Sequence, residues 1–168
     1  IDATKCDTGW CSVKTVGLGF HIEDLPVGRR FKTIGRTITD ADIVNYVNCT
    51  GLTEVLFTDA EFRAGESAIK GRFAPAMLAY SFAEGLLVQA TMQHTALALL
   101  NLQVEVHHPV FAGDTIHVEV EVLEARESKS RPNRGLVRMR NEIIRQDGTK
   151  VLTYTLLRMV KRRPAHAQ

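Results

Sequence analysis

The stretch TGLTEVLFTD, residues 50–59, has the composition of a catalytic loop: small residues, an acid, and an apolar run closed by a second acid. Glu54 is the only acid inside the loop, and a carboxylate in such a place can transfer a proton. The alternative is an exposed carboxylate without a chemical role, because glutamate side chains are mostly exposed. Both interpretations of Glu54 stay open from the residues alone.

Histidines are the other candidates for proton transfer, because their ordinary pKa lies near neutrality. His107 and His108 end an alternating segment just before a turn. Adjacent strand residues point to opposite faces, so at most one of the two can face a pocket. His94 follows a long apolar segment, and we expect it to interact with the C-terminal end of a helix dipole there.

Composition limits the classes of function. The chain has 168 residues, of which 45% are apolar and 24% charged, as expected for one soluble globular domain. A net charge of +2 gives no support for nucleic-acid binding, and we expect the basic cluster at residues 158–164 to be a solvated tail. No apolar run approaches the ~20 residues of a membrane helix, so we expect no membrane partner. Without a signal peptide, the expected location is cytoplasmic.

The three cysteines, Cys6, Cys11 and Cys49, form no CxxC or Cys/His pattern. The sequence therefore supports neither a zinc site nor a disulfide framework, and we expect no metal and no cofactor. A pairing of Cys6 with Cys11 around their short loop remains an alternative, although a reducing cytoplasm is the default for such a composition.

The first half of the chain predicts one strand and two helices. We expect residues 1–24 to form an arm that wraps the domain, and residues 29–39 to form a strand. Thr39 is a good N-cap for a helix over residues 40–51, with Ile43, Tyr46 and Val47 on its buried face. Residues 59–75 are expected to be short and irregular. Residues 76–92 are apolar or small nearly throughout, which is typical of a helix buried on all sides.

The second half predicts antiparallel strands. Residues 100–107 alternate strictly, which predicts burial of Leu100, Leu102, Val104 and Val106. Residues 116–127 alternate again, with Ile116, Val118, Val120 and Val122 inside. Residues 136–146 and 149–162 form two more strands joined by a hairpin turn at Asp147 and Gly148. The fold class is therefore α+β: one antiparallel sheet of about five strands wrapped round a long buried helix, within a single domain over residues 25–162 and followed by a flexible tail, 163–168.

Four stretches together resemble the MaoC-like dehydratase and (R)-specific enoyl-CoA hydratase family. They are IEDLPVGRRF, GRTITDADIVNYVNCTG, GRFAPAMLAYSFAEGL and HHPVFAGDTIHVEVEV, and the resemblance extends over residues 22–162. It implies a hotdog fold, an acyl-thioester ligand carried by CoA or a carrier protein, and a homodimer with pockets shaped between protomers.

The family's signature loop carries an Asp and, five positions later, a His, which act in the addition of water to an α,β double bond. Here Leu52 and Phe57 hold those positions, and neither side chain can move a proton. Thr50, Gly51 and Asp59 still match the loop. The resemblance also implies that enolate stabilisation comes from backbone N–H groups after Pro75, at Ala76 and Met77, although Ala76 stands where glycine is common.

Three functions are compatible with this pattern. The leading one is an acyl-thioester binding protein whose hydratase or dehydratase chemistry is altered or lost, with Glu54 as the best remaining proton-transfer group. Related hotdog thioesterases use an acid on the central helix as base or nucleophile, a role that Glu84 would take; pairing with an arginine at the helix rim is its alternative. The third is a non-catalytic subunit that partners an active paralogue.

The resemblance also implies roles for other side chains, and some of these have an alternative interpretation. Arg72 is expected to bind the phosphates or pantetheine of the thioester carrier, or else to be a surface charge. Asp59, Pro75, Ala76 and Met77 complete the expected substrate-binding set. The side chains of Met77, Tyr80 and Phe82 are expected in the core, with an acyl tunnel as their alternative role.

Overall fold

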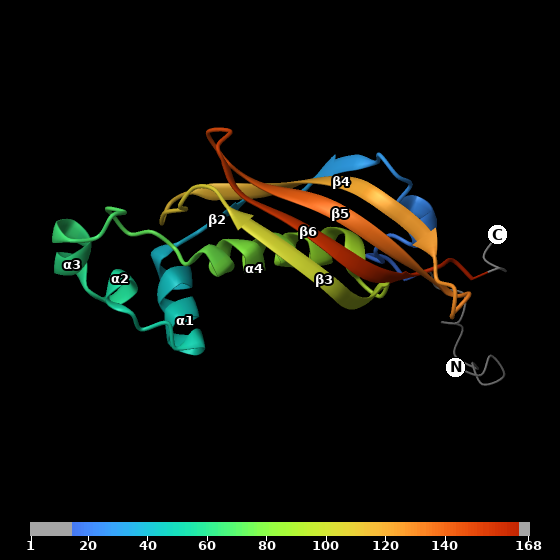
Figure 1. Cartoon of the computed structure of the whole chain (residues 1–168), viewed down its shortest axis with the longest axis horizontal. Coiled ribbons are helices and arrows are strands. Elements are labelled where there is room, and N and C mark those ends of the chain that lie inside the picture. Colours follow the sequence, from blue (N-terminus) through green and yellow to red (C-terminus); the bar gives the residue numbers. More distant parts are fainter. Residues whose placement is uncertain (1–14, 165–168) are drawn as a thin grey trace.

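The computed structural model describes residues 15–164 (Figure 1). Its helices are η2 (Ile22–Asp24), α1 (Asp40–Thr50), α2 (Val55–Thr58), α3 (Ala60–Gly65), α4 (Ala76–Leu87) and η3 (Val88–Met92). Its strands are β1 (Arg30–Lys32), β2 (Arg36–Thr37), β3 (Ala96–Val106), β4 (Thr115–Glu127), β5 (Arg134–Arg145) and β6 (Lys150–Lys161).

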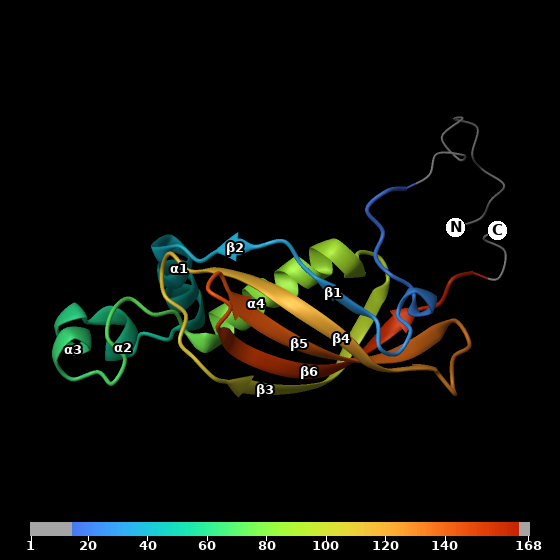
Figure 2. The ribbon, with the colours of Figure 1, turned by 90° about the horizontal axis from the view of Figure 1, so that it is seen from above.

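All strand pairs are antiparallel and form a single sheet in the order β1-β4-β5-β6-β3, with β2 also pairing β4. The sheet curls over α4, which lies along its inner face (Figures 1 and 2). The predicted α+β arrangement is thus confirmed. The strand expected over residues 29–39 is instead two short strands that both pair with β4, because the regular pairing is interrupted over residues 33–35.

Helix α1 begins and ends where its sequence predicts. The Thr39 hydroxyl accepts a hydrogen bond from Asp42 N at 3.2 Å, and the Asp42 carboxylate accepts one from Thr39 N at 2.8 Å. These bonds from Thr39 hold the pKa of Asp42 below its ordinary value. Gly51 ends the helix with φ 71°, a left-handed conformation that glycine adopts without strain. The capped helix fixes the direction in which residues 52–59 leave it.

Helix α4 is less buried than its composition predicts. Leu78, Ala79, Ala83 and Leu87 pack into the core, but Met77 is 41% exposed on the opposite side. Val88 is exposed as well, where η3 continues α4 as a π-helical turn. The prediction of burial on all sides, with Met77 in the core, is therefore wrong: one sheet covers one side of the helix, and a stripe remains open within the described chain.

In the edge strand β3, too, the sequence pattern predicts more burial than the structure shows. Of its four residues predicted to be buried, only Leu102 and Val104 pack against the core, while Leu100 is 49% exposed and Val106 also lies open. Two register shifts against β6, between Ala96 and Ala98 and between Leu99 and Asn101, disturb the alternation. Strand β4 lies inside the sheet, and there the four predicted residues are all buried.

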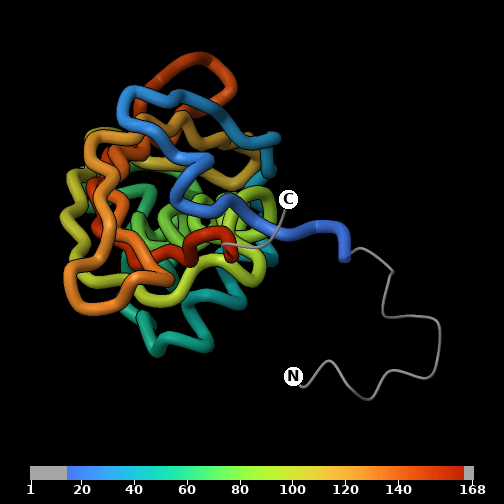
Figure 3. Tube along the Cα trace, turned by 90° about the vertical axis from the view of Figure 1, so that its right-hand side faces the viewer, coloured from blue at the N-terminus to red at the C-terminus, as the bar shows by residue number. Residues whose placement is uncertain are grey.

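Both ends of the described chain lie at the same end of the molecule (Figures 1 and 2), the end that faces the viewer in Figure 3. Phe20 N donates to Thr91 O at 2.7 Å, so residues of the predicted arm do pack on the end of η3. Arg162 and Arg163 bond to Glu23 and Asp24 of η2. Most of the predicted arm, with Cys6 and Cys11, and most of the predicted tail lie outside the described residues.

Candidate functional site

A largely apolar pocket of about 250 Å³ opens at the N-terminal end of α4. It lies between the start of that helix, the segment that follows β3, and the first residues of β6. Its lining residues are Phe57, Ile69, Phe73, Ala74, Pro75, Ala76, Ala79, Val106, His107, His108, Pro109, Val110, Val151 and Leu152. Of the sequence-predicted substrate-binding residues, Pro75 and Ala76 therefore line the pocket.

Phe57 occupies one wall of this pocket. Its ring packs on that of Phe73, with centroids 5.5 Å apart. The position at which the resemblance places a histidine is therefore inside the pocket and is filled by an apolar ring. This wall can bury an acyl chain but cannot transfer a proton.

The other loop residues do not line the pocket. Leu52 is 40% exposed, and Glu54 is exposed at the start of α2. The Asp59 carboxylate accepts a hydrogen bond from Phe62 N at 3.0 Å and so caps α3. The structure therefore gives Asp59 a structural contact, and it does not bring Glu54 to the place where a ligand would react.

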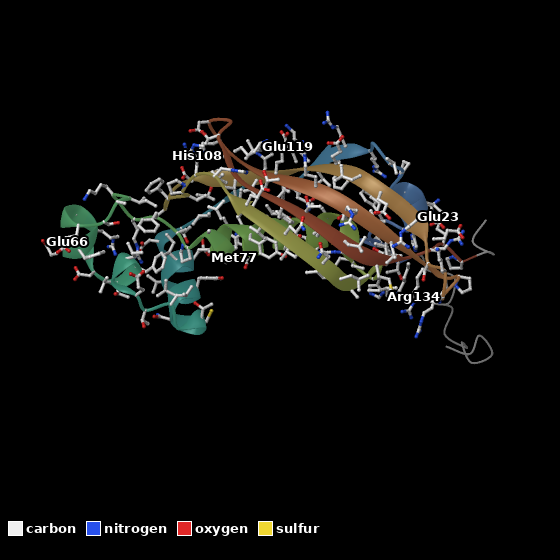
Figure 4. The ribbon with its side chains drawn as sticks, viewed as in Figure 1. Glu23, Glu66, Met77, His108, Glu119 and Arg134 are labelled. Carbon is white, nitrogen blue, oxygen red and sulfur yellow. The ribbon has the colours of Figure 1, made fainter. Side chains whose placement is uncertain are left out.

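The first turn of α4 supplies backbone donors beside the pocket. Leu78 N donates to Pro75 O at 2.9 Å, at the start of the helix. The N–H groups of Ala76 and Met77 belong to a first turn, whose donors have no intrahelical acceptors, and the helix dipole favours negative charge there. An enolate or thioester oxygen would be stabilised at this position. The Met77 side chain itself is exposed and does not line the pocket (Figure 4).

Arg72 makes its contacts within the protein. Its Nε donates to the Asp40 carboxylate at 2.6 Å, and its Nη1 donates to the Phe57 carbonyl at 2.6 Å. These bonds join the start of α1 to the end of α2. The structure thus gives Arg72 a local partner on each side.

His107 and His108 both line the pocket, and each hydrogen-bonds to β6. The expectation that at most one of them could face a pocket is therefore wrong, because both residues follow the end of β3, where the alternation of a strand no longer applies. His107 Nε2 is 2.9 Å from the Thr153 hydroxyl. His108 Nδ1 is 3.0 Å from the Lys150 carbonyl, which can only accept, so Nδ1 carries the proton. Figure 4 shows His108 where the chain leaves β3. Neither hydrogen bond involves another residue that lines the pocket.

Glu84 lies deeper along α4 in a buried polar cluster. Its carboxylate accepts a hydrogen bond from the Tyr154 hydroxyl at 3.0 Å and forms an ion pair with Arg158. Burial, together with the charge of Glu84, raises the pKa of Tyr154 above its ordinary value. The Tyr80 ring packs edge-on against Tyr154, with centroids 5.1 Å apart. Glu84 is thus paired with an arginine, as in the alternative to a catalytic role that the sequence left open.

Arg158 is the residue of this cluster that sequence reasoning missed. The prediction that residues 158–164 form a solvated tail is wrong for Arg158, which is buried on β6. The signal was present: Tyr154, Leu156, Arg158 and Val160 continue one period-two series, and the whole series is buried.

Residues 15–164 contain neither a cluster of metal ligands nor a membrane-spanning helix. No group of three or more His, Cys, Asp or Glu side chains there is arranged to hold a metal ion. None of the helices in that range has the length and apolar character needed to cross a bilayer.

Comparison with solved structures identifies related folds. A MaoC-like dehydratase from Rhodospirillum rubrum is 29% identical, with 87% of this chain and 99% of that chain covered and a TM-score of 0.75. An R-hydratase from Pseudomonas aeruginosa is 24% identical, with 86% and 88% covered and a TM-score of 0.70. A Mycobacterium tuberculosis protein described as a double hotdog fold is 24% identical, with 92% and 48% covered and a TM-score of 0.78.

The fold predicted from the resemblance is therefore confirmed as a hotdog. None of the curated proteins compared with this chain matches it. The sequence pattern of the MaoC like domain matches residues 24–144, which is more than half of the chain and includes the pocket's Phe57 wall and the start of α4. The chain belongs to the MaoC-like domain family.

Proposed function

We propose that this protein binds an acyl thioester in the pocket at the start of α4 and that the usual hydratase chemistry is altered or lost. What supports the proposal is that the Phe57 ring and the start of α4, where first-turn N–H groups lack intrahelical acceptors, line the same pocket. The donors suit a thioester oxygen and the apolar wall suits an acyl chain, whereas Phe57 and the exposed Leu52 supply no acid or base.

Between the remaining alternatives, the geometry favours a non-catalytic or regulatory subunit over a thioesterase. A base or nucleophile at Glu84 would need a free carboxylate near the thioester carbon. Its two carboxylate oxygens instead accept from Tyr154 and Arg158, and Glu84 does not line the pocket. The thioesterase alternative would be revived if acyl-CoA released free CoA and a Glu84→Gln variant did not.

Binding of butyryl-CoA is the direct test of the proposed ligand. Each buried CH₂ contributes about 0.8 kcal/mol, so butyryl-CoA is expected to bind at least ~10-fold more tightly than free CoA. Ala76→Phe should fill the pocket and abolish this difference, whereas Ala64→Phe, the same change on exposed helix α3, should preserve it. Titration calorimetry measures both constants. Equal affinities for CoA and butyryl-CoA in the wild-type protein would refute an acyl pocket.

We further propose that the protein is a homodimer formed across β3. Three exposed leucines, Leu97, Leu99 and Leu100, lie along this edge strand, and Met77 and Val88 are exposed on α4 and η3. An unpaired edge with apolar side chains favours association with a second copy. Closed two-fold pairing would also place a second chain near both pockets.

The dimer is expected in sedimentation velocity runs at micromolar protein concentration. Leu100→Lys should yield monomers, because it places a charge in the apolar centre of the edge. Leu123→Lys, on an exposed leucine of β4, is the matched control and should stay dimeric. A wild-type protein that sediments as a monomer would contradict the proposal.

A further inference from the structure

We propose that Arg72 is a positioning residue that latches the segment over the pocket and thereby keeps Phe57 in the pocket wall. The segment is residues 52–70, which carry α2 and α3, and we name it the lobe. Figures 1 and 2 both show α2 and α3 beyond the end of the sheet, away from α4. The lobe therefore lies outside the packing between α4 and the sheet.

Two glycines in left-handed conformations bracket the lobe. Gly51 has φ 71° and Gly71 has φ 88°. Backbone at positive φ is the place where glycine allows a change of direction without a steric cost. The lobe thus leaves and rejoins the domain through two residues that can act as hinges.

The lobe's own side-chain hydrogen bonds hold it together as a unit. Arg63 donates to the Leu56 carbonyl, Lys70 donates to carbonyls at the end of α3, and the Ser67 hydroxyl donates to Ile69 O. These bonds are internal to the lobe, so they do not fasten it to the domain.

Arg72 provides the polar link between the lobe and the domain. Its guanidinium reaches the Asp40 carboxylate on one side and the Phe57 carbonyl on the other, each at 2.6 Å. The bonds are charge-assisted, and the forked guanidinium fixes both directions at once. The Phe57–Phe73 ring contact lies beside this link, so losing the latch leaves one aromatic contact to keep the wall in place.

The latch also affects the shape of the pocket. Phe57 both accepts the latch hydrogen bond through its carbonyl and lines the pocket, so a change in its position changes the width of the pocket. The effect on ligand access rests on the proposed function, whereas the latch itself does not. Arg72 acts through Phe57 and need not touch the ligand.

Hydrogen–deuterium exchange of the ligand-free protein tests the latch. Arg72→Gln is expected to speed amide exchange in residues 52–70 by at least ~10-fold, because local opening sets exchange in weakly packed segments. Exchange in β4 and β5 should stay unchanged. Lys70→Gln is the matched control, because it removes only bonds within the lobe, and its exchange near residue 57 should equal that of the wild type. Asp40→Asn removes the negative charge at the other end of the latch, which weakens its bond with Arg72, and should also speed exchange in the lobe.

The outcomes distinguish a latch at Arg72 from a direct contact between Arg72 and the ligand. Unchanged lobe exchange in both Arg72→Gln and Asp40→Asn overturns the latch, and weaker CoA binding in Arg72→Gln alone would then indicate a phosphate contact. Faster exchange in the lobe supports the latch even if no acyl thioester binds. Where the ligand does bind, the latch predicts that Arg72→Gln raises its association and dissociation rates together.

Discussion

Wild-type protein is expected to hydrate crotonyl-CoA at a rate several orders of magnitude below ~10 s⁻¹, the median turnover of enzymes. Each missing proton-transfer group costs ~10²–10⁴ in rate, and the two losses are not additive. The structure adds a physical reason, because Phe57 fills the pocket wall with a ring and Glu54 lies outside the pocket. Loss of absorbance of the enoyl thioester measures the reaction, and ordinary turnover by the wild-type protein would contradict the expectation.

The informative variant restores both proton-transfer groups of the family's loop. Leu52→Asp with Phe57→His is expected to give measurable hydration, at least ~10-fold above wild type, because the α4 donors remain and position 57 lies in the pocket wall, while the exposed position 52, outside the pocket, lets the new carboxylate act on a water molecule. Positioning alone can supply ~7–11 kcal/mol of a barrier in favourable cases. Leu52 is 40% exposed, so a carboxylate there keeps solvent contact and the cost of burying a charge is small. Phe57→His alone, with one group restored, is the control and should remain inactive. A folded double variant that binds butyryl-CoA without hydrating crotonyl-CoA would indicate a pocket rebuilt for another purpose.

Arg158→Met is expected to lower the free energy of unfolding by about 3–5 kcal/mol, because it leaves the Glu84 carboxylate without its cation in a nearly closed site. The exposed fractions of the two side chains are 7% and 16%. Urea unfolding followed by circular dichroism measures the loss. Adding Glu84→Gln should recover part of it, because the carboxylate that needs the cation is then absent.

The matched control for this experiment is Arg138→Met. Arg138 pairs with Glu124, but the side chains are 35% and 38% exposed. Exposed pairs contribute about 0–1 kcal/mol, so the control should cost little. Equal losses in Arg138→Met and Arg158→Met would show that the Glu84–Arg158 pair has no special role in stability.

Sequence patterns predicted correctly the elements that depend on local backbone requirements or that have neighbours on both sides in the sheet. Thr39 and Gly51 bound α1 because both residues satisfy local backbone requirements that no distant contact changes. Strand β4 has partners on both sides and one inner face, so its alternation corresponds directly to burial. Strand β3 has the same alternation but lies at an edge, and its exposed Leu100 shows that a pattern cannot reveal which strand lacks a neighbour.

The site was predictable only in part. The loop motif singled out Phe57 and the start of α4, and the structure places both in the lining of one pocket. The partners of Arg72 and Glu84 were not predictable by name, since Asp40 is 32 positions from Arg72 and Arg158 is 74 positions from Glu84. Such pairs depend on how strands and helices pack, which local periodicity does not contain.

The unequal edges of the sheet bear on how far it can polymerise. One edge is the long strand β3, and the other is made of β1 and β2, of three and two residues, interrupted between them. When two copies pair through β3, the long edges are consumed and only the short, broken edges face outward, with Arg30 and Lys32 on β1. Such edges are poor templates for a further strand. In the proposed dimer, growth of the sheet would therefore stop at two chains.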